Sequence, residues 1–205
     1  MATLDRRYAV GELSRRRVTP AQRIAEDAEA VARTCRAVAE RFRRGGKLIA
    51  FGNGCTATDA QHVSVEFVHP VIVGKRSLPA ITLSADGAAV TGVANREGFE
   101  EIFAHQLRLF AEPEDIALGI SSSGGCTNVL RGLQAGHERG LLTVGMVGGD
   151  GGVIARCPEV DHVLAAASDD PRVVKELHVT TYHILWELVH VFFEQPGILT
   201  PEPVR

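Results

Sequence analysis

Short apolar runs alternate with longer amphipathic stretches along most of the chain. Most runs end at a glycine or a small polar residue, a pattern typical of strands that are buried on both faces of a sheet. The stretches between the runs repeat their apolar residues every three or four positions, which predicts helices. The predicted strands are 48–51, 79–83, 115–120, 142–147 and 160–166. The segments predicted to be helical after the first strand are one that carries His62 and Glu66, a helical or turn segment at 85–95, and helices at 99–110, 128–139 and 171–194.

The first long helix is predicted to begin at Thr19-Pro20, where threonine would cap the helix and proline would take its first position. Apolar residues from Ile24 to Phe42 recur at helical spacing until Gly45-Gly46 ends the pattern. The preceding residues are rich in arginine, and we expect them to form a loose arm or a short helix laid on a partner subunit. The expected division is an N-terminal arm at 1–18, one domain at 19–195 and a C-terminal tail at 196–205.

Alternating strands and helices with short connections predict a three-layer, doubly wound α/β domain with five parallel strands. The helix at 171–194 is apolar on most of its sides toward its end. Because one sheet covers only one side of a helix, we expect the long N- and C-terminal helices to pack in an oligomer.

Composition agrees with one globular domain and excludes several classes of protein. The 205 residues are 45% hydrophobic and 23% charged, which is ordinary for a domain with a sizeable core. A formal charge of −3 argues against a general nucleic-acid binder. The apolar runs are too short to span a membrane, the N-terminus is too polar for a secretory signal, and the four scattered cysteines indicate free thiols. We therefore expect a cytoplasmic protein.

Two glycine-rich polar turns follow predicted strands. In the first, Gly52-Asn53-Gly54 leads into a helix that Thr56 or Thr58 would cap. The second, Ser121–Thr127, offers serine hydroxyls and glycine amides. A single cluster of this kind is often a plain loop. Two of them, each at the carboxyl end of a strand and the start of a helix, favour a phosphate site.

The sequence lacks the glycine motifs of nucleotide and dinucleotide binding and the serine elbow of hydrolases, so a sugar phosphate suits these turns best. His62 and Glu66 lie four residues apart and share one face of a predicted helix. Such a pair can bind a metal or move protons, but it is also common as an ordinary surface hydrogen bond. Its position just after the first glycine turn favours a functional role.

The chain resembles the sugar isomerase (SIS) domain family and, within it, the phosphoheptose isomerases. The resemblance covers nearly the whole chain, from the first long helix to the last. The motifs that carry it are Gly52-Asn53-Gly54, Asp59-Ala60-Gln61-His62 with Glu66, Leu78-Pro79-Ala80-Ile81, Gly98-Phe99 with Ile102-Phe103, Gly119-Ile120-Ser121-Ser122-Ser123-Gly124 with Asn128-Val129, Asp150-Gly151-Gly152, and Glu176-Leu177-His178 with His183.

The resemblance implies an aldose–ketose isomerase that converts sedoheptulose 7-phosphate to D-glycero-D-manno-heptose 7-phosphate or acts on a related phosphosugar. It implies Glu66 as the base that moves a proton between neighbouring carbons, and His183 as the acid or base that serves the oxygens. It also implies a homotetramer with active sites between subunits. Substrate contacts are expected from Asn53, Gly54, Thr56, Arg96, Ser121, Ser122, Ser123, Cys126, Arg172 and Lys175.

Several pocket positions depart from the family pattern. Cys55-Thr56 stands where the family has Gly-Ser, and Gly125-Cys126 stands where it has Asn followed by Ser. Arg96 and Arg172 replace aspartates, which favours a more anionic ligand than a monophosphate. The alternative is that these arginines point to solvent or to a neighbouring subunit. The same departures support an alternative function, a non-catalytic SIS module that binds phosphosugars or a protein partner.

Some family members hold zinc at the positions of His62, Glu66 and His183 and of a glutamine that is Lys175 here. An ammonium group cannot ligate a metal while it keeps its proton, and a cation beside these residues repels zinc. We therefore predict no cofactor, with Lys175 neutralising Glu66 or polarising a ligand oxygen. The alternative is zinc on the remaining three residues. Helical spacing adds that Glu176 shares a side with His183 and can be a ligand instead.

Overall fold

The computed structural model describes residues 6–195, which contain a five-stranded sheet with all strands parallel. The strands are β1 (Leu48–Gly52), β2 (Ala80–Thr82), β3 (Ile116–Ser121), β4 (Leu142–Gly148) and β5 (His162–Ala166), in the order β2-β1-β3-β4-β5. Each lies within a few residues of its predicted bounds. The doubly wound parallel fold predicted from the alternating pattern is confirmed.

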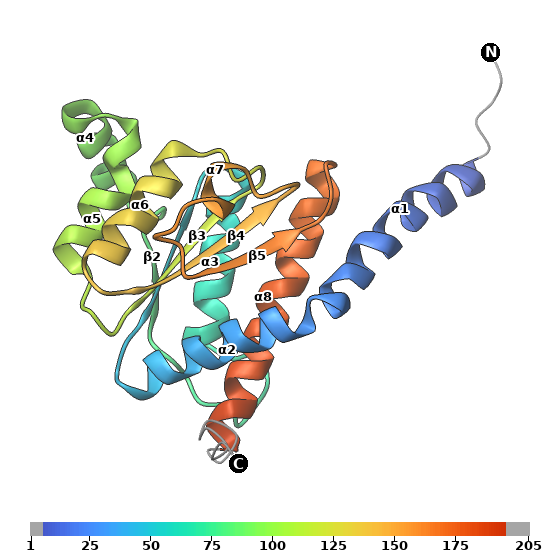
Figure 1. Ribbon diagram of the computed structural model, residues 1–205, viewed down its shortest axis with the longest axis horizontal. Helices are drawn as coiled ribbons and strands as arrows, with labels where there is room; N and C mark the ends of the chain where they lie inside the picture. Colours follow the sequence, from blue (N-terminus) through green and yellow to red (C-terminus); the bar gives the residue numbers. More distant parts are fainter. Residues whose placement is uncertain (1–5, 196–205) are drawn as a thin grey trace.

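Helices cover both faces of the sheet (Figure 1). One face packs against α2 (Ala28–Arg43), α3 (Cys55–Val68) and α8 (Pro171–Glu194). The helices on the other side are α4 (Gly87–Glu97), the 3-10 helix η1 (Phe99–Glu101), α5 (Ile102–Phe110), α6 (Thr127–Glu138) and α7 (Gly152–Ala155). In β1, Leu48 and Ala50 belong to the first core, and Ile49 and Phe51 to the second. Side chains alternate along a strand, so a strand with two covered faces is apolar throughout.

The N-terminal helices differ from the prediction. α1 (Arg6–Glu26) ends just before Asp27 and α2 begins just after it, so the expected helix start at Thr19-Pro20 is wrong. Pro20 lies inside α1, although a proline nitrogen cannot donate the helical hydrogen bond. Contacts between α1 and α8 supply tertiary packing that overrides this local signal. Figure 1 shows α1 leading away from the sheet, nearly in line with α2.

Smaller differences concern the turns and the ends. α3 begins at Cys55, after Gly54, and no side chain caps it. The predicted caps bond elsewhere: the Thr56 hydroxyl contacts the backbone of Asn53, and the Thr58 hydroxyl donates to the carbonyl of Cys55. The predicted tail at 196–205 and residues 1–5 of the predicted arm lie outside the described residues. Among residues 6–195, no helix has the length and apolar character needed to cross a membrane.

Candidate active site

The two glycine turns lie next to each other at one end of the sheet. β1 and β3 are neighbours, and Gly52 at the end of β1 pairs in register with Ile120 near the end of β3. The chain leaves β1 into α3 on one face and leaves β3 into α6 on the other. Such a reversal opens a crevice at the carboxyl ends of the strands, where open α/β sheets bind their ligands.

A reciprocal amide pair joins the first of these turns to α6, the helix that follows the second turn. Asn53 Nδ2 donates to Asn128 Oδ1 over 2.8 Å, and Asn128 Nδ2 donates to Asn53 Oδ1 over 2.9 Å. The backbone before Asn53 is also tightly packed, because a Cβ atom on Gly52 would lie 2.6 Å from the Thr56 hydroxyl oxygen and 2.8 Å from the Ile120 carbonyl oxygen. The amide of Asn53 therefore binds the first turn of α6, and its contact with a substrate stays a prediction.

The serine turn borders a hollow of about 420 Å³ at the ends of β3 and β4. Ser122 and Ser123 line it, together with Asp150 and Asp169. The Ser121 hydroxyl is fully buried and has no hydrogen-bond partner among the described residues. Hydroxyl groups beside the N-terminus of α6 suit a phosphate, whereas the two carboxylates repel one. A phosphate in this hollow needs a cation from elsewhere in the chain or from another subunit.

His62, Glu66 and His183 come together where α3 packs against α8. Their ligand atoms all lie within 4.8 Å of one another. His62 Nε2 lies 3.1 Å from Glu66 Oε1, and His183 Nε2 lies 3.9 Å from the same oxygen. The Glu66 side chain is 8% exposed, whereas the imidazoles of His62 and His183 are 42% and 46% exposed. A buried carboxylate between two accessible imidazoles is an arrangement suited to proton transfer with a bound ligand.

One face of α8 holds this cluster in place. Trp186 Nε1 donates to the backbone carbonyl of Glu66 over 2.8 Å, and the Tyr182 hydroxyl lies 2.6 Å from His62 Nδ1. Burial raises the pKa of the Tyr182 phenol, and the charges of Asp59 and Glu66 raise it further, so the phenol keeps its proton. Neither Tyr182 nor Trp186 is predicted as a site residue from the sequence. Their spacing of four residues predicts that they share one face of a helix. It does not predict which other helix packs against that face.

Lys175 pairs with Asp59 rather than with Glu66. Its ammonium group contacts the Asp59 carboxylate and also donates to the carbonyl of Cys55 over 2.7 Å and to the hydroxyl of Thr58 over 3.2 Å. Asp59 is 2% exposed, and a buried carboxylate requires a nearby cation. The hypothesis that Lys175 neutralises Glu66 is therefore wrong within this chain, because Lys175 contacts Asp59, which lies about two helical turns before Glu66 on α3.

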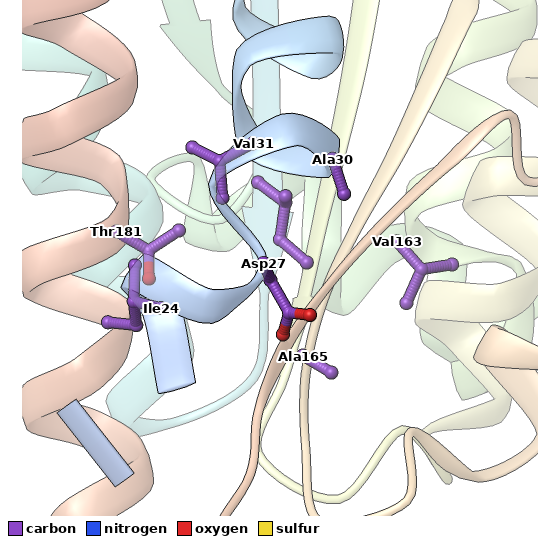
Figure 2. Close-up of a pocket in the computed structure, with 8 residues that line it drawn as sticks. Ile24, Asp27, Ala30, Val31, Val163, Ala165 and Thr181 are labelled. Atoms are coloured by element: carbon purple, nitrogen blue, oxygen red, sulfur yellow. The ribbon is translucent and has the colours of Figure 1, made fainter. Parts of the chain in front are cut away.

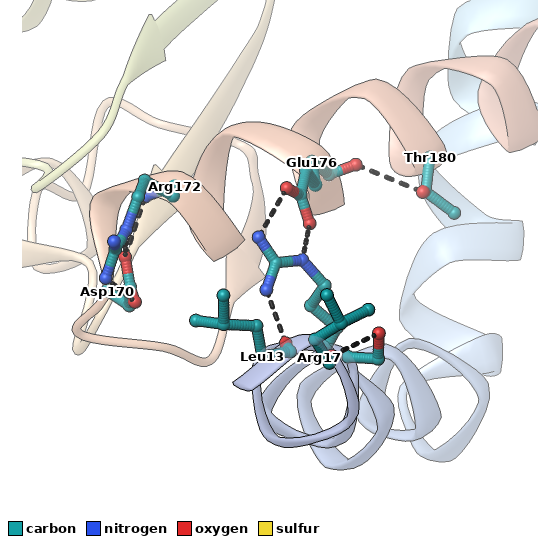
Figure 3. Close-up of polar contacts among 8 residues, drawn as sticks. Leu13, Arg17, Asp170, Arg172, Glu176 and Thr180 are labelled. Atoms are coloured by element: carbon teal, nitrogen blue, oxygen red, sulfur yellow. Dashed lines mark hydrogen bonds and ion pairs between the residues drawn. The ribbon is translucent and has the colours of Figure 1, made fainter. Parts of the chain in front are cut away.

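The other charged residues at the start of α8 also have partners within the chain. Glu176 accepts hydrogen bonds of 2.6 and 2.9 Å from Arg17 of α1 (Figure 3), so its carboxylate binds α1 rather than the histidine cluster. Arg172 donates to Asp170 over 2.9 and 2.7 Å. These hydrogen bonds lower the pKa of Asp170 to about 2.

The remaining predicted contacts lie around the turns. Arg96, at the end of α4, donates to Glu97 over 2.8 Å and has a side chain that is 69% exposed. Cys126 precedes α6 and is half-buried, and Gly54 is exposed before α3. Their contacts with a substrate stay predictions, as do those of Thr56 and Arg172.

The His62 cluster also fits a metal ion. Two imidazole nitrogens and one carboxylate oxygen form the ligand set of open zinc sites, and the three ligand atoms lie within 4.8 Å of one another. A zinc ion held by His62, Glu66 and His183 would polarise the carbonyl and hydroxyl oxygens of a bound sugar. Lys175 is not a fourth ligand in this arrangement, because its ammonium group is paired with Asp59.

Comparison with known proteins agrees with this geometry. A family model for the SIS domain matches residues 16–148. A phosphoheptose isomerase from Solidesulfovibrio magneticus is 39% identical over 177 residues, which cover 86% of this chain and 85% of the relative. One from Pelobacter propionicus is 42% identical over 150 residues, which cover 73% of this chain and 78% of the relative. The solved structure of a phosphoheptose isomerase from Neisseria gonorrhoeae matches with a TM-score of 0.80 and 29% identity, covering 91% of this chain and 98% of that one. The chain therefore belongs to the SIS domain family and, within it, to the phosphoheptose isomerases.

Proposed function

We propose that the protein is an aldose–ketose isomerase that interconverts sedoheptulose 7-phosphate and D-glycero-D-manno-heptose 7-phosphate or a closely related sugar phosphate. Membership of the phosphoheptose isomerases supports the substrate class. The observation that carries the proposal is the meeting of Glu66 with His62 and His183 at the contact between α3 and α8. Moving a proton between neighbouring carbons needs such a positioned carboxylate and an accessible second acid or base.

In the proposed reaction, the carboxylate of Glu66 removes a proton from carbon 1 of the open-chain ketose, and an enediol forms. The resulting carboxylic acid returns that proton to carbon 2, which yields the aldose. A second proton moves from the oxygen on carbon 1 to the oxygen on carbon 2, and His183 serves these oxygens as acid and base. The two side chains supply both transfers, so we propose that catalysis needs no cofactor.

We propose that the substrate phosphate binds at the serine turn, where Ser121, Ser122 and Ser123 precede the N-terminus of α6. The carboxylates in the same hollow must be balanced by cations. Arg172 and Arg96 have side chains that are 68% and 69% exposed, which leaves both able to reach a ligand or a neighbouring subunit.

We also propose a homotetramer in which subunits complete one another's sites. Two hollows with apolar walls border the junction of α1 and α2. One of about 180 Å³ lies between this junction, β5 and α8 (Figure 2), and one of about 260 Å³ runs along α1, α2 and α8. Further exposed apolar side chains are Val10, Leu13 and Val18 on α1 and Val71, Ile72 and Val73 after α3. Covering such surface is favourable by about 25 cal/mol per Å², and light scattering of the purified protein tests the subunit number.

All four cysteines carry free thiols, which supports the proposal of a cytoplasmic location.

Adding sedoheptulose 7-phosphate to the purified protein and following aldose formation tests the reaction. Glu66→Gln keeps the size of the side chain and the backbone carbonyl that Trp186 binds, and it is expected to lower kcat by about a thousandfold because the base is lost. Glu187→Gln, an exposed position on the same α8 helix as His183, is the control and should leave kcat unchanged. Binding of the sugar phosphate without turnover above the Glu66→Gln level would contradict the isomerase and support a regulatory binding module.

A further inference from the structure

The backbone carbonyl of Glu66 lies in the last turn of α3 and lacks the usual helical donor. In an α-helix, each backbone carbonyl accepts a hydrogen bond from the N–H group four residues later. For Glu66 that residue is Pro70, whose nitrogen carries no hydrogen. α3 ends at Val68, two residues before this proline. Glu66 is 7% exposed, and a buried carbonyl that has no donor is costly.

The indole of Trp186 supplies this donor from α8. Trp186 Nε1 donates to the Glu66 carbonyl over 2.8 Å, an ordinary length for such a hydrogen bond. Trp186 is 5% exposed, and its ring packs against the ring of His190 with a centroid distance of 4.4 Å. The indole nitrogen can only donate, so the direction of the bond is unambiguous. The side chain of Trp186 therefore takes the place of the amide that Pro70 lacks.

The neighbouring carbonyls of the same turn have backbone donors. The carbonyl of Val65 accepts from the N–H group of His69 over 2.7 Å, and that of Phe67 accepts from the N–H group of Leu78 over 2.8 Å. Among these three carbonyls, that of Glu66 is the one bound by a side chain from another helix. The last turn of a helix frays easily, so the position of Glu66 depends on its contact with α8.

We infer that Trp186 is a positioning residue that fixes Glu66, the proposed base, relative to His183. Trp186 follows His183 by three residues and shares its face of α8, and α8 lies beside α3 on one face of the sheet (Figure 1). His183 Nε2 lies 3.9 Å from Glu66 Oε1, and the indole bond sets the register at which the two helices hold this distance.

The indole bond involves only the backbone of α3. It therefore does not depend on whether a metal ion joins the side chains of His62, Glu66 and His183. The inference rests on the proposed isomerase for its effect on kcat, whereas the hydrogen bond is a property of the folded chain and can be measured without substrate.

Proton exchange of the indole tests the hydrogen bond. Trp186 is the sole tryptophan of the chain, so its indole N–H group gives one NMR signal that needs no further assignment. In the full-length protein this proton is expected to exchange with deuterium oxide about a hundredfold more slowly than in the same protein unfolded in urea. Equal exchange in the folded and unfolded protein would overturn the inference.

A double-mutant cycle tests the link between Trp186 and Pro70. Trp186→Phe removes the indole donor, and Pro70→Ala restores a backbone N–H group four residues after Glu66. Pro70→Ala should therefore raise the melting temperature more in the Trp186→Phe background than in the native background. The effect of the proline on the unfolded chain is common to both backgrounds and cancels. Equal shifts in the two backgrounds would show that the indole does not replace the missing amide.

The same variants test the effect on the reaction. Trp186→Phe should lower kcat about tenfold and keep KM within about twofold, because proton transfer depends on the placement of the base more strongly than binding does. Adding Pro70→Ala should return kcat to within about threefold of the native value. Leu185→Val is the control, because it removes a buried methylene from the same core and leaves the indole bond in place; its kcat should stay within about twofold. An unchanged kcat in Trp186→Phe, or a kcat that Pro70→Ala fails to restore, would overturn the positioning role.

If Trp186→Phe fails to fold, benzothienylalanine at position 186 takes its place in both experiments, because it replaces the indole N–H group by sulfur and keeps the shape of the ring. Absence of turnover in the native protein would contradict the proposed isomerase. The proton exchange and the melting temperatures would still decide whether the indole of Trp186 replaces the missing amide of Pro70.

Discussion

The ammonium group of Lys175 on α8 pairs with the carboxylate of Asp59 on α3. The two side chains differ in exposure, since that of Asp59 is 2% exposed and that of Lys175 is 34% exposed. The buried carboxylate depends on this cation, so the pair joins the start of α8 to the first half of α3. It also keeps the charge of Lys175 away from Glu66, the partner expected from the sequence.

Lys175→Met should lower the free energy of unfolding by about 2 kcal/mol, because it leaves the buried charge of Asp59 without its partner. Urea denaturation measures the change. The double variant Lys175→Met with Asp59→Asn should regain part of the loss, since the unpaired charge is then absent. Lys75→Met, which breaks a contact with the 55% exposed Glu194, is the control and should cost less than about 1 kcal/mol. Additive effects of the two substitutions at 59 and 175 would show that the pair is not coupled.

The dialysed protein should contain less than one zinc ion per subunit, and chelators should leave its activity and melting temperature unchanged. The physical reason is that His62, Glu66 and His183 offer only three ligands, and the ammonium group of Lys175, which is paired with Asp59, cannot add a fourth. Elemental analysis measures the zinc content. Lys175→Gln, which offers a neutral amide, is the variant in which zinc content should rise. Stoichiometric zinc in the native protein would refute this prediction.

Asn128→Ala should lower the free energy of unfolding by about 1–2 kcal/mol and raise KM for the sugar phosphate several-fold. The substitution removes both hydrogen bonds to Asn53, of 2.8 and 2.9 Å, and so releases the first glycine turn from the serine turn. Denaturation and steady-state kinetics measure the two effects. Asn95→Ala, at an exposed position on α4, should change neither. An unchanged KM in Asn128→Ala would show that the amide pair has no part in forming the binding site.

Stability should fall as the pH is lowered from about 6.5 to 5.5. Burial lowers the pKa of His178 from its ordinary 6.5, against a backbone contact with Val147 and the charge of Asp59, which raise it. The folded protein therefore keeps His178 neutral at a pH where the unfolded chain binds a proton. Its contribution to stability is fully present above pH 6.5 and decreases below it, by at most about 1.4 kcal/mol per pH unit.

Melting temperatures of the native protein and of His178→Gln across this range check the prediction. The variant cannot bind the proton in the unfolded state, so its melting temperature should depend less on pH. His69→Gln, at an exposed position, should retain the native dependence. An equal slope in native protein and His178→Gln would mean that another group causes the loss of stability.

The sequence by itself determined the architecture and the end of the sheet at which the two glycine turns lie. Short apolar runs such as Leu48–Phe51, which end at glycine turns and alternate with helical patterns, indicate strands buried on both faces. A turn that follows such a strand lies at the carboxyl edge of the parallel sheet. The spacing of His62 and Glu66 also determined that they share a helix face, and the structure places them 3.1 Å apart. The strands, the glycine turns and the shared helix face of His62 and Glu66 each depend on residues that are close together in the sequence. The sequence pattern within a short segment therefore predicts them.

Tertiary structure alone decided which residues meet across elements. The contacts of Tyr182 with His62 and of Trp186 with Glu66 join positions 120 residues apart. No local sequence pattern predicts the register in which two helices pack against each other. The register between α3 and α8 also decides the partner of Lys175, because a shift of α8 by one turn would place Lys175 against another residue of α3 instead of Asp59. It also explains the helix at Pro20, where contacts with α8 override a cap signal. Helix periodicity sets which face of a helix is buried, whereas the packing of the whole core sets the register between two helices, and the chemistry of the site depends on that register.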